Sequence, residues 1–248
     1  MSIRNSLLRT YFARRMKAID RFRRHPDQVQ AEMFRQLIAR GADTEFGRRH
    51  GVAKHLTPEA FAARVGVQDY ESFKPYIERM LAGEKNVAAP GRVTLFARSS
   101  GTTSDRSKFI PVTRESVWWN HTLGMRDVAA VYASAKPQTK IFDGKTLTLG
   151  GSYVRENGAL IGDLSAVLIS QTPFWSGWFR APKMETALIP DFDRKIEGIC
   201  RECTREKITA FAGVPSWNLV LMRRVLEYTG KSLSLIHISE PTRLRRIS

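Results

Sequence analysis

The sequence predicts an α/β fold in which a mixed sheet is flanked by helices and preceded by a helical N-terminal segment. Two observations lead to this prediction. Helix-capping signals and helical spacings fill the first part of the chain, whereas after Val93 short apolar runs of strand type alternate with helical patterns. The 248 residues are 42% hydrophobic and 10% aromatic, so the chain can bury a core and is neither disordered nor fibrous.

The first 25 residues predict a basic amphipathic helix. They contain eight Lys and Arg residues against a single acid, Asp20. We expect one packed helix with a solvated basic face, ended by His25-Pro26. An Arg-rich amphipathic start is also typical of a transit peptide or of an anchor on an anionic membrane. The apolar residues recur at helical spacing, at Leu8, Tyr11, Phe12, Ile19 and Phe22.

Capping residues place three further helices in the N-terminal segment. Asp27 can cap a helix that Gly41 ends, and the glycine- and charge-rich stretch from there to Gly51 is predicted to be a loop. The pair Thr57-Pro58 is an N-cap followed by proline at the first helical position. Asp69 can cap the third of these helices.

From Val93 onward, predicted strands and helices alternate. Short apolar runs predict strands at 93–97, 109–112, 146–149, 166–169 and 208–212. Helical spacings predict helices at 115–135, 192–206 and 216–228. This order favours a sheet that is partly parallel.

Charge and cysteine content limit the class of protein. The net charge of +16 by itself favours a polyanionic partner. Two cysteines cannot form a disulfide-dense secreted scaffold, so we expect the reducing cytoplasm. No apolar run approaches the roughly 18 to 20 residues that a membrane-spanning helix needs. The five histidines show no metal-ligand spacing, and we expect no metal site on the protein itself.

Two local patterns are weak signals. The pair Cys200-x-x-Cys203 lacks the further ligands that a zinc site needs, so both residues are expected to be ordinary helix cysteines. An aromatic cluster after Pro173 could line a flat apolar ligand pocket, although core packing is the favoured interpretation. Its members are Phe174, Trp175, Trp178 and Phe179.

One loop has the composition of a phosphate-binding site. It lies between the predicted strands 93–97 and 109–112 and reads Arg98-Ser-Ser-Gly-Thr-Thr-Ser-Asp-Arg-Ser-Lys108. Gly101 lets the backbone turn and approach a ligand closely, the hydroxyl-bearing residues supply donors, and Lys108 supplies a positive charge. Phosphate suits such a loop because it offers several acceptor oxygens. A plain surface loop between two strands is the alternative.

The segment from Ser99 to Lys108 resembles the ATP phosphate-binding loop of the adenylate-forming superfamily (firefly luciferase and acyl-CoA synthetases). Its lysine lies seven residues beyond Gly101, whereas six is the common spacing. The longer spacing is similar to that of the auxin-responsive acyl-acid amido synthetases, which conjugate auxin and jasmonate to amino acids. The resemblance, to the bacterial form of that family, covers roughly residues 8 to 232. It includes Asp43-Thr-Glu-Phe-Gly47, Val67-Gln-Asp-Tyr70, Leu147-Thr-Leu-Gly-Gly151, Gly162-Asp-Leu-Ser165 and Gly213-Val-Pro-Ser-Trp217.

The resemblance implies part of the large N-terminal domain of an adenylate-forming enzyme, a ligase that uses ATP and Mg²⁺. ATP would convert a carboxylic acid to an acyl-adenylate, and an amino acid or amine would then attack it to give an amide. Val214, Pro215, Ser216 and Trp217 would border the acyl or nucleotide pocket, unless Pro215-Ser216 merely starts a helix. The phosphates would be bound by Ser99, Ser100, Gly101, Thr102, Thr103, Ser104 and Lys108.

The resemblance also implies domain boundaries. Residues 1–232 would form a partial N-terminal adenylation domain, because later family motifs and a smaller C-terminal domain are missing. Residues 233–248 begin with LSLIHISEPTR, which resembles translated sequencing-adaptor DNA. We therefore expect a truncated chain with a non-native tail, inactive alone. The alternatives are an adenylating enzyme that forms acyl-coenzyme A and a basic nucleic-acid-binding protein.

Overall fold

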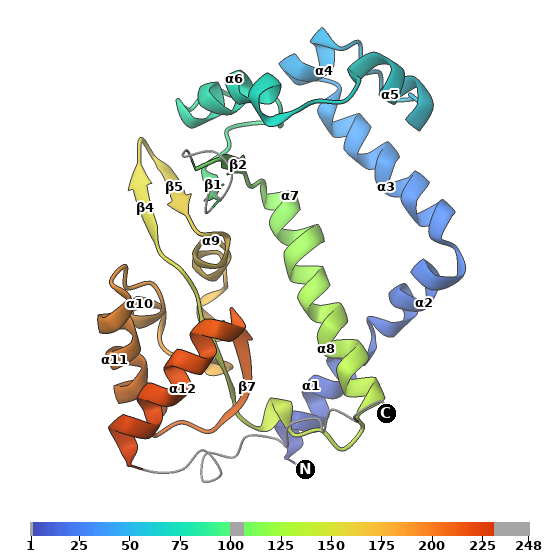
Figure 1. Cartoon of the computed structure of the whole chain (residues 1–248). Coiled ribbons are helices and arrows are strands. Elements are labelled where there is room, and N and C mark those ends of the chain that lie inside the picture. The colour runs from blue at the N-terminus through green and yellow to red at the C-terminus, as the bar shows by residue number, and fades with distance from the viewer. Residues whose placement is uncertain (1, 100–106, 231–248) are drawn as a thin grey trace, which may run out of the picture.

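The computed structural model describes residues 2–99 and 107–230. The α/β class is confirmed, and the N-terminal segment is helical, as predicted. The chain runs from the N-terminus along α3 to α4, α5 and α6, which lie at the opposite end of the molecule (Figure 1). The helices of this segment are α1 (Ile3–Ala13), α2 (Met16–Arg24), α3 (Pro26–Gly41), α4 (Glu45–Arg49), α5 (Pro58–Val65) and α6 (Tyr70–Leu81).

The basic N-terminal stretch forms two helices, so the prediction of one helix is wrong. The break falls at Arg14 and Arg15, between α1 and α2. There the Arg15 guanidinium donates to both carboxylate oxygens of Asp127, at 2.6 and 3.1 Å. The chain then turns again at Pro26, the first residue of α3, so Asp27 lies inside the first turn and is not the cap.

The stretch 41–51 was predicted to be a loop, but it contains the short helix α4. Buried Thr44 is the N-cap: its Oγ1 accepts from the backbone N–H of Gly47 at 3.0 Å and donates to the carbonyl oxygen of Gly41 at 2.6 Å. A Cβ atom on Gly47 would lie 2.1 Å from that same carbonyl oxygen, which explains the glycine. The predicted N-caps Thr57 and Asp69 are both confirmed.

A four-stranded sheet carries the predicted strands around the serine-rich loop. Its order is β2-β1-β5-β4, with β1 antiparallel to β2 and parallel to β5. The hairpin β4–β5 was not predicted, although its turn residues Asn157 and Gly158 both have positive φ, at 48° and 76°. The strands are β1 (Leu95–Arg98), β2 (Phe109–Pro111), β4 (Tyr153–Glu156) and β5 (Ala159–Gly162).

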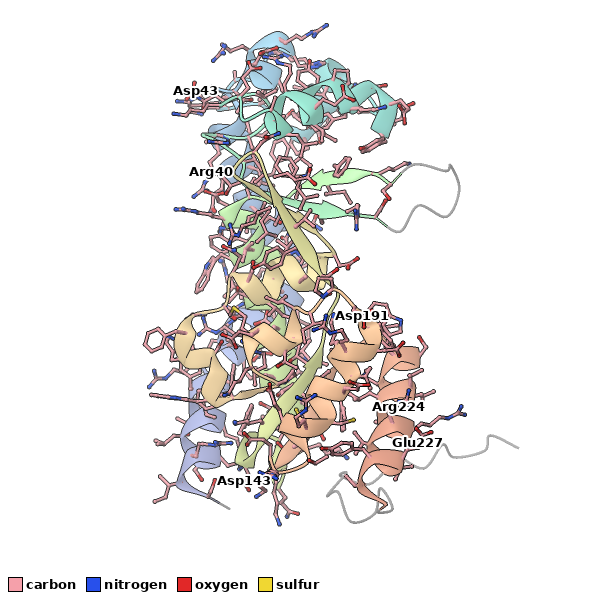
Figure 2. All side chains as sticks on the ribbon, turned by 90° about the vertical axis from the view of Figure 1, so that its left-hand side faces the viewer. Arg40, Asp43, Asp143, Asp191, Arg224 and Glu227 are labelled. Atoms are coloured by element: carbon pink, nitrogen blue, oxygen red, sulfur yellow. The ribbon has the colours of Figure 1, made fainter. Side chains whose placement is uncertain are left out.

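A second, three-stranded sheet has the order β6-β3-β7, and β3 is parallel to both neighbours. Its strands are β3 (Lys145–Leu149), β6 (Arg180–Ala181) and β7 (Ile208–Gly213). Two predicted helices, α11 (Phe192–Cys203) and α12 (Pro215–Thr229), pack against this sheet around buried Ile199 and Leu221. Figure 2 shows Asp191 at the start of α11, and Arg224 and Glu227 together on α12.

The predicted helix 115–135 is confirmed as one continuous helix. It comprises α7 (Arg114–Ser116), the π-helical turn η1 (Val117–Thr122) and α8 (Leu123–Ala135). α8 packs beside α1, and Arg15, which follows α1, pairs with Asp127 on α8. A short 3-10 helix, η2 (Ile141–Asp143), then leads into β3.

The predicted strand 166–169 is wrong, because these residues lie in the helix α9 (Leu164–Ser170). Ala166, Val167 and Ile169 are all buried where α9 packs against β1 and β5. A helix that is apolar on most sides cannot be distinguished from a buried strand by so short a run. Two further short helices follow, η3 (Phe174–Trp178) and α10 (Met184–Ala187).

Three residues of the aromatic cluster, Phe174, Trp175 and Trp178, are exposed on η3, so the favoured interpretation of core packing is wrong for them, whereas Phe179 directly after η3 is half-buried. The Phe174 side chain is 90% exposed and that of Trp178 is 70% exposed. The helix cysteines behave as predicted, since Cys200 and Cys203 are free and buried. Within the two described stretches, no helix is both long enough and apolar enough to cross a membrane.

Candidate functional site

Ser99 and Lys108, the two ends of the predicted phosphate loop, lie side by side. The backbone N–H of Ser99 donates to the carbonyl oxygen of Lys108 at 2.9 Å, and the backbone N–H of Lys108 donates to the Ser99 Oγ at 3.0 Å. These bonds continue the antiparallel pairing of β1 and β2, in which Arg98 faces Phe109. The two strands lie together in Figure 2. The hairpin therefore fixes both anchors of the loop.

The side chain of Lys108 lies against the start of α6. Its Nζ atom is 5.1 Å from the ring centroid of Tyr70, a cation–π distance. The neighbouring carboxylate, Asp69, caps α6 by accepting from the backbone N–H of Ser72 at 2.7 Å. Hydrogen bonds from Ser72, with a smaller contribution from the charge of Lys108, hold the pKa of Asp69 below its usual range. The side chain of Lys108 is exposed to solvent, and the ring of Tyr70 restricts where its ammonium group lies.

The other predicted phosphate ligands are Ser100, Gly101, Thr102, Thr103 and Ser104. All five lie outside the described residues, as does the acidic Asp105 that follows them.

The second predicted group, Val214 to Trp217, lies at the junction of β7 and α12. Val214 is the N-cap and Pro215 begins α12, so Pro215-Ser216 does start a helix, whereas the pocket assignment stays a prediction. Trp217 is 37% exposed, and its ring lies 5.7 Å from that of Phe192 on α11. This corner belongs to the three-stranded sheet, so it shares no strand pairing with the hairpin that carries Ser99 and Lys108.

A buried polar cluster that sequence analysis did not find lies at the end of β3. The Nζ atom of Lys195, on α11, donates to the carbonyl oxygens of Gly150 at 2.7 Å and Gly151 at 2.8 Å. Lys195 is only 2% exposed. Burial lowers the pKa of Lys195, and the charge of Asp163 partly opposes that effect.

Asp163 and Ser165 complete the cluster from the start of α9. The Asp163 carboxylate accepts from the backbone N–H of Ser152 at 3.0 Å, and the Ser165 Oγ accepts from that of Gly151 at 2.9 Å. These residues belong to the motifs Leu147–Gly151 and Gly162–Ser165. The sequence shows both motifs as a resemblance but not their contact, because Lys195 lies 45 residues beyond Gly150.

Gly150-Gly151, which follows β3, and Val214, which follows β7, lie at the same edge of the three-stranded sheet. β3 and β7 are parallel, and Leu149 pairs with Gly213 at their carboxyl ends. Ligands of open α/β sheets bind preferentially at this edge. The pairing brings the motifs Leu147–Gly151 and Gly213–Trp217 together. Lys195 holds the first of these motifs through the carbonyl groups of its two glycines.

Arg126 on α8 has an unused donor. Its guanidinium carbon lies 4.9 Å from the ring centroid of Tyr11 and 5.9 Å from that of Trp118. Its Nε atom is buried and has no hydrogen-bond partner among the described residues. Over the same residues, no group of three His, Cys, Asp or Glu side chains could hold a metal ion.

One protein-family model matches most of the chain. The family described as "GH3 family N-terminal domain" matches residues 15–197. A probable indole-3-acetic acid-amido synthetase, GH3.2 of Oryza sativa subsp. japonica, is 34% identical over 106 residues, which are 42% of this chain and 17% of the relative. The indole-3-acetic acid-amido synthetase GH3.3 of Arabidopsis thaliana is 29% identical over 103 residues, 41% of this chain and 17% of the relative.

Solved structures agree on the fold. The GH3.15 acyl acid amido synthetase superposes with a TM-score of 0.67 at 16% identity, over 92% of this chain and 40% of that one. The AtGH3.15 enzyme in complex with 2,4-DB gives a TM-score of 0.63 at 19% identity, over 86% and 39%. The chain thus spans less than half the length of the solved relatives. It belongs to the GH3 family and has the fold of that family's N-terminal domain.

Proposed function

We propose that this chain is the N-terminal part of an ATP-dependent ligase that activates a carboxylic acid and conjugates it to an amino acid or amine, in a bacterial member of the GH3 family. The observation that carries the proposal is the hairpin β1–β2, which sets Ser99 and Lys108 side by side at the two ends of a serine- and threonine-rich loop. Relatives named as indole-3-acetic acid-amido synthetases support the reaction class.

The proposed first step attaches the acid to the α-phosphate of ATP and releases pyrophosphate. A carboxylate is a poor electrophile because attack on it would have to expel oxide, whereas the acyl-adenylate expels AMP. In this proposal, Ser99, Ser100, Gly101, Thr102, Thr103 and Ser104 donate to the β- and γ-phosphates, and Lys108 neutralises their charge. Mg²⁺ would supply further charge neutralisation at the phosphates. In the second step, the amine attacks the acyl carbon and an amide forms.

The test is pyrophosphate release by the protein from the complete gene, supplied with ATP and a panel of carboxylic acids. Lys108→Ala and Thr102→Ala are expected to lower the rate by at least about tenfold, since each removes a phosphate contact worth more than 1.4 kcal/mol in the transition state. Lys136→Ala, a change at an exposed lysine that ends α8, is the matched control. Unchanged rates in both loop variants would contradict the assignment of the loop.

Two other functions differ in their products or in their salt dependence. An acyl-coenzyme A synthetase would share the loop but would consume a thiol, so product analysis with amine and thiol acceptors separates the two. A nucleic-acid-binding protein driven by the charge of +16 would bind any polyanion, with an affinity that falls steeply with salt. The family match favours the ligase.

We further propose the division into a partial adenylation domain, 1–232, and a non-native tail, 233–248. Support comes from the tail sequence itself, because LSLIHISEPTR resembles translated sequencing-adaptor DNA. Sequencing independent genomic DNA across codon 232 tests this, and recovery of the same tail would contradict it. The 248-residue chain is then expected to turn over ATP poorly.

Free Cys200 and Cys203 fit the proposed cytoplasmic location.

A further inference from the structure

The motif Val67–Tyr70 has a physical role at the proposed phosphate loop that its sequence does not reveal. Tyr70 is the first residue of α6. One of its groups contacts Phe109 and another contacts Lys108. Its hydroxyl oxygen accepts from the backbone N–H of Phe109 at 2.9 Å, at the start of β2. Its ring faces the Lys108 ammonium at 5.1 Å.

We propose that Tyr70 is a positioning residue for Lys108, setting both the backbone and the ammonium group of the lysine toward an incoming phosphate. The proposal rests on the proposed function, because it assumes that Lys108 binds the phosphates of ATP.

The backbone contact fixes where the lysine begins. Ser99 holds the N–H of Lys108 from the β1 side, and Tyr70 holds the N–H of Phe109 from the α6 side. Two successive backbone groups are therefore bound from two different elements. Such a double anchor removes conformational freedom that the lysine would otherwise lose when phosphate binds.

The ring contact fixes where the side chain points. A lysine side chain has four rotatable bonds, and an exposed one samples many rotamers. An aromatic face attracts the ammonium group without using up its hydrogen-bond donors, so all three N–H groups stay available for phosphate oxygens. The carboxylate of Asp69 lies near enough to interact with the charge of Lys108, but its Oδ1 atom accepts hydrogen bonds from Ser72.

The first measurement is the position of the lysine itself. The 248-residue chain is dimethylated on its lysines with ¹³C-formaldehyde, and Lys108→Met identifies the Lys108 signal. We expect that signal to be shifted upfield by the ring current of Tyr70, to keep the shift in Tyr70→Phe and to lose it in Tyr70→Leu. A Lys108 signal that does not respond to Tyr70→Leu would overturn the inference.

The second measurement uses the 248-residue chain with unmodified lysines. It determines the affinity of that chain for MgATP and for inorganic tripolyphosphate. Tyr70→Leu is expected to weaken binding about two- to five-fold, the effect of losing an exposed cation–π contact. Tyr70→Phe keeps the ring but loses the hydroxyl contact with the N–H of Phe109, so it is expected to weaken binding less than Tyr70→Leu does. In a Lys108→Met background, Tyr70→Leu is expected to have no further effect, whereas a purely structural role would persist.

The matched control is Tyr153→Leu. Tyr153 carries a similar contact with Arg155 at 5.7 Å, on β4 at the opposite edge of the same sheet. Equal affinity losses in Tyr70→Leu and Tyr153→Leu would overturn the inference and leave the proposed function intact. A shifted Lys108 signal in a chain that binds neither ATP nor tripolyphosphate would instead overturn the phosphate-loop assignment, whereas the ligase function itself is decided by pyrophosphate release from the complete gene product.

Discussion

The ammonium group of Lys195 lies 2.7 Å from the carbonyl oxygen of Gly150, at a position where the lysine is almost fully buried. The same group bonds Gly151, whose carbonyl is also buried. The chain passes at this point from β3 in the three-stranded sheet to β4 in the four-stranded sheet. One charged side chain therefore holds the passage between the two sheets.

Lys195→Met removes this donor and leaves two buried carbonyl groups without it. We expect the free energy of unfolding to fall by about 3 kcal/mol, because each unsatisfied buried acceptor costs about 1–3 kcal/mol. Urea unfolding followed by circular dichroism measures the change. Arg194→Met, the same replacement at the exposed neighbour on α11, is expected to change it by less than about 0.5 kcal/mol. Similar losses in the two variants would contradict the role of Lys195.

Gly151→Ala tests how closely α9 approaches the passage. A Cβ atom at Gly151 would lie 2.0 Å from the Oδ2 atom of Asp163, which itself binds the N–H of Ser152. The carboxylate would have to move and release that bond, so we expect a loss of about 3 kcal/mol on urea unfolding. Gly177→Ala is the control, since no heavy atom lies within 4 Å of the added Cβ there. A Gly151→Ala protein as stable as Gly177→Ala would show that this geometry is wrong.

Thr44→Ala removes the buried cap of α4. The hydroxyl serves both Gly41 and Gly47, so we expect the free energy of unfolding to fall by about 2 kcal/mol, the upper end for N-caps. Thr44→Ser keeps the hydroxyl and is expected to recover more than half of that loss. The exposed cap Thr57, changed to alanine, is expected to cost only about 0.5 kcal/mol. Thermal unfolding of the three variants decides, and equal costs at Thr44 and Thr57 would contradict the prediction.

The two thiols are expected to be unreactive in the native protein. Burial raises the pKa of Cys203 to about 12 and also raises that of Cys200. A thiol-specific disulfide reagent at pH 7.5 should therefore label neither residue before unfolding and both residues in urea. Rapid labelling of the folded chain would contradict the burial of α11.

The same thiols make stability depend on pH at the alkaline end. Below the ordinary thiol pKa of 9.0, folded and unfolded chains both keep the protons. Between pH 9.0 and about 12, the unfolded chain releases a proton that folded Cys203 retains, so stability falls as pH rises through this window. Cys203→Ala is expected to show a smaller fall than the unaltered chain in urea unfolding at pH 7.5 and pH 10. An identical fall in both would contradict this attribution.

Local signals were enough to predict most of the fold. Capping at Thr57 and Asp69 was visible in the sequence because the caps are contacts within three residues. The strands on either side of the proposed phosphate loop were visible because their apolar runs are short and end in polar residues. For the same reason, the sequence located both anchors of the candidate site, Ser99 and Lys108.

The errors arose where tertiary contacts decide the structure. The run 166–169 resembles a strand because α9 is buried on most sides. The aromatic cluster that begins at Phe174 resembles core because large aromatic residues are usually buried. The hairpin at Asn157-Gly158 was missed although its turn signal was present. Neither the Lys195 cluster nor the Tyr70 contact with Lys108 could be found from spacing, since both join elements far apart in sequence.

The two sheets are interleaved along the chain, and this order has a consequence for how the molecule can come apart. The four-stranded sheet takes its strands from residues 95–162, and the three-stranded sheet takes its strands from 145–213. β3 therefore lies in sequence between the two halves of the other sheet. No single cut between residues 95 and 213 leaves both sheets whole, so neither sheet can be inherited, exchanged or removed as a module without dismantling the other.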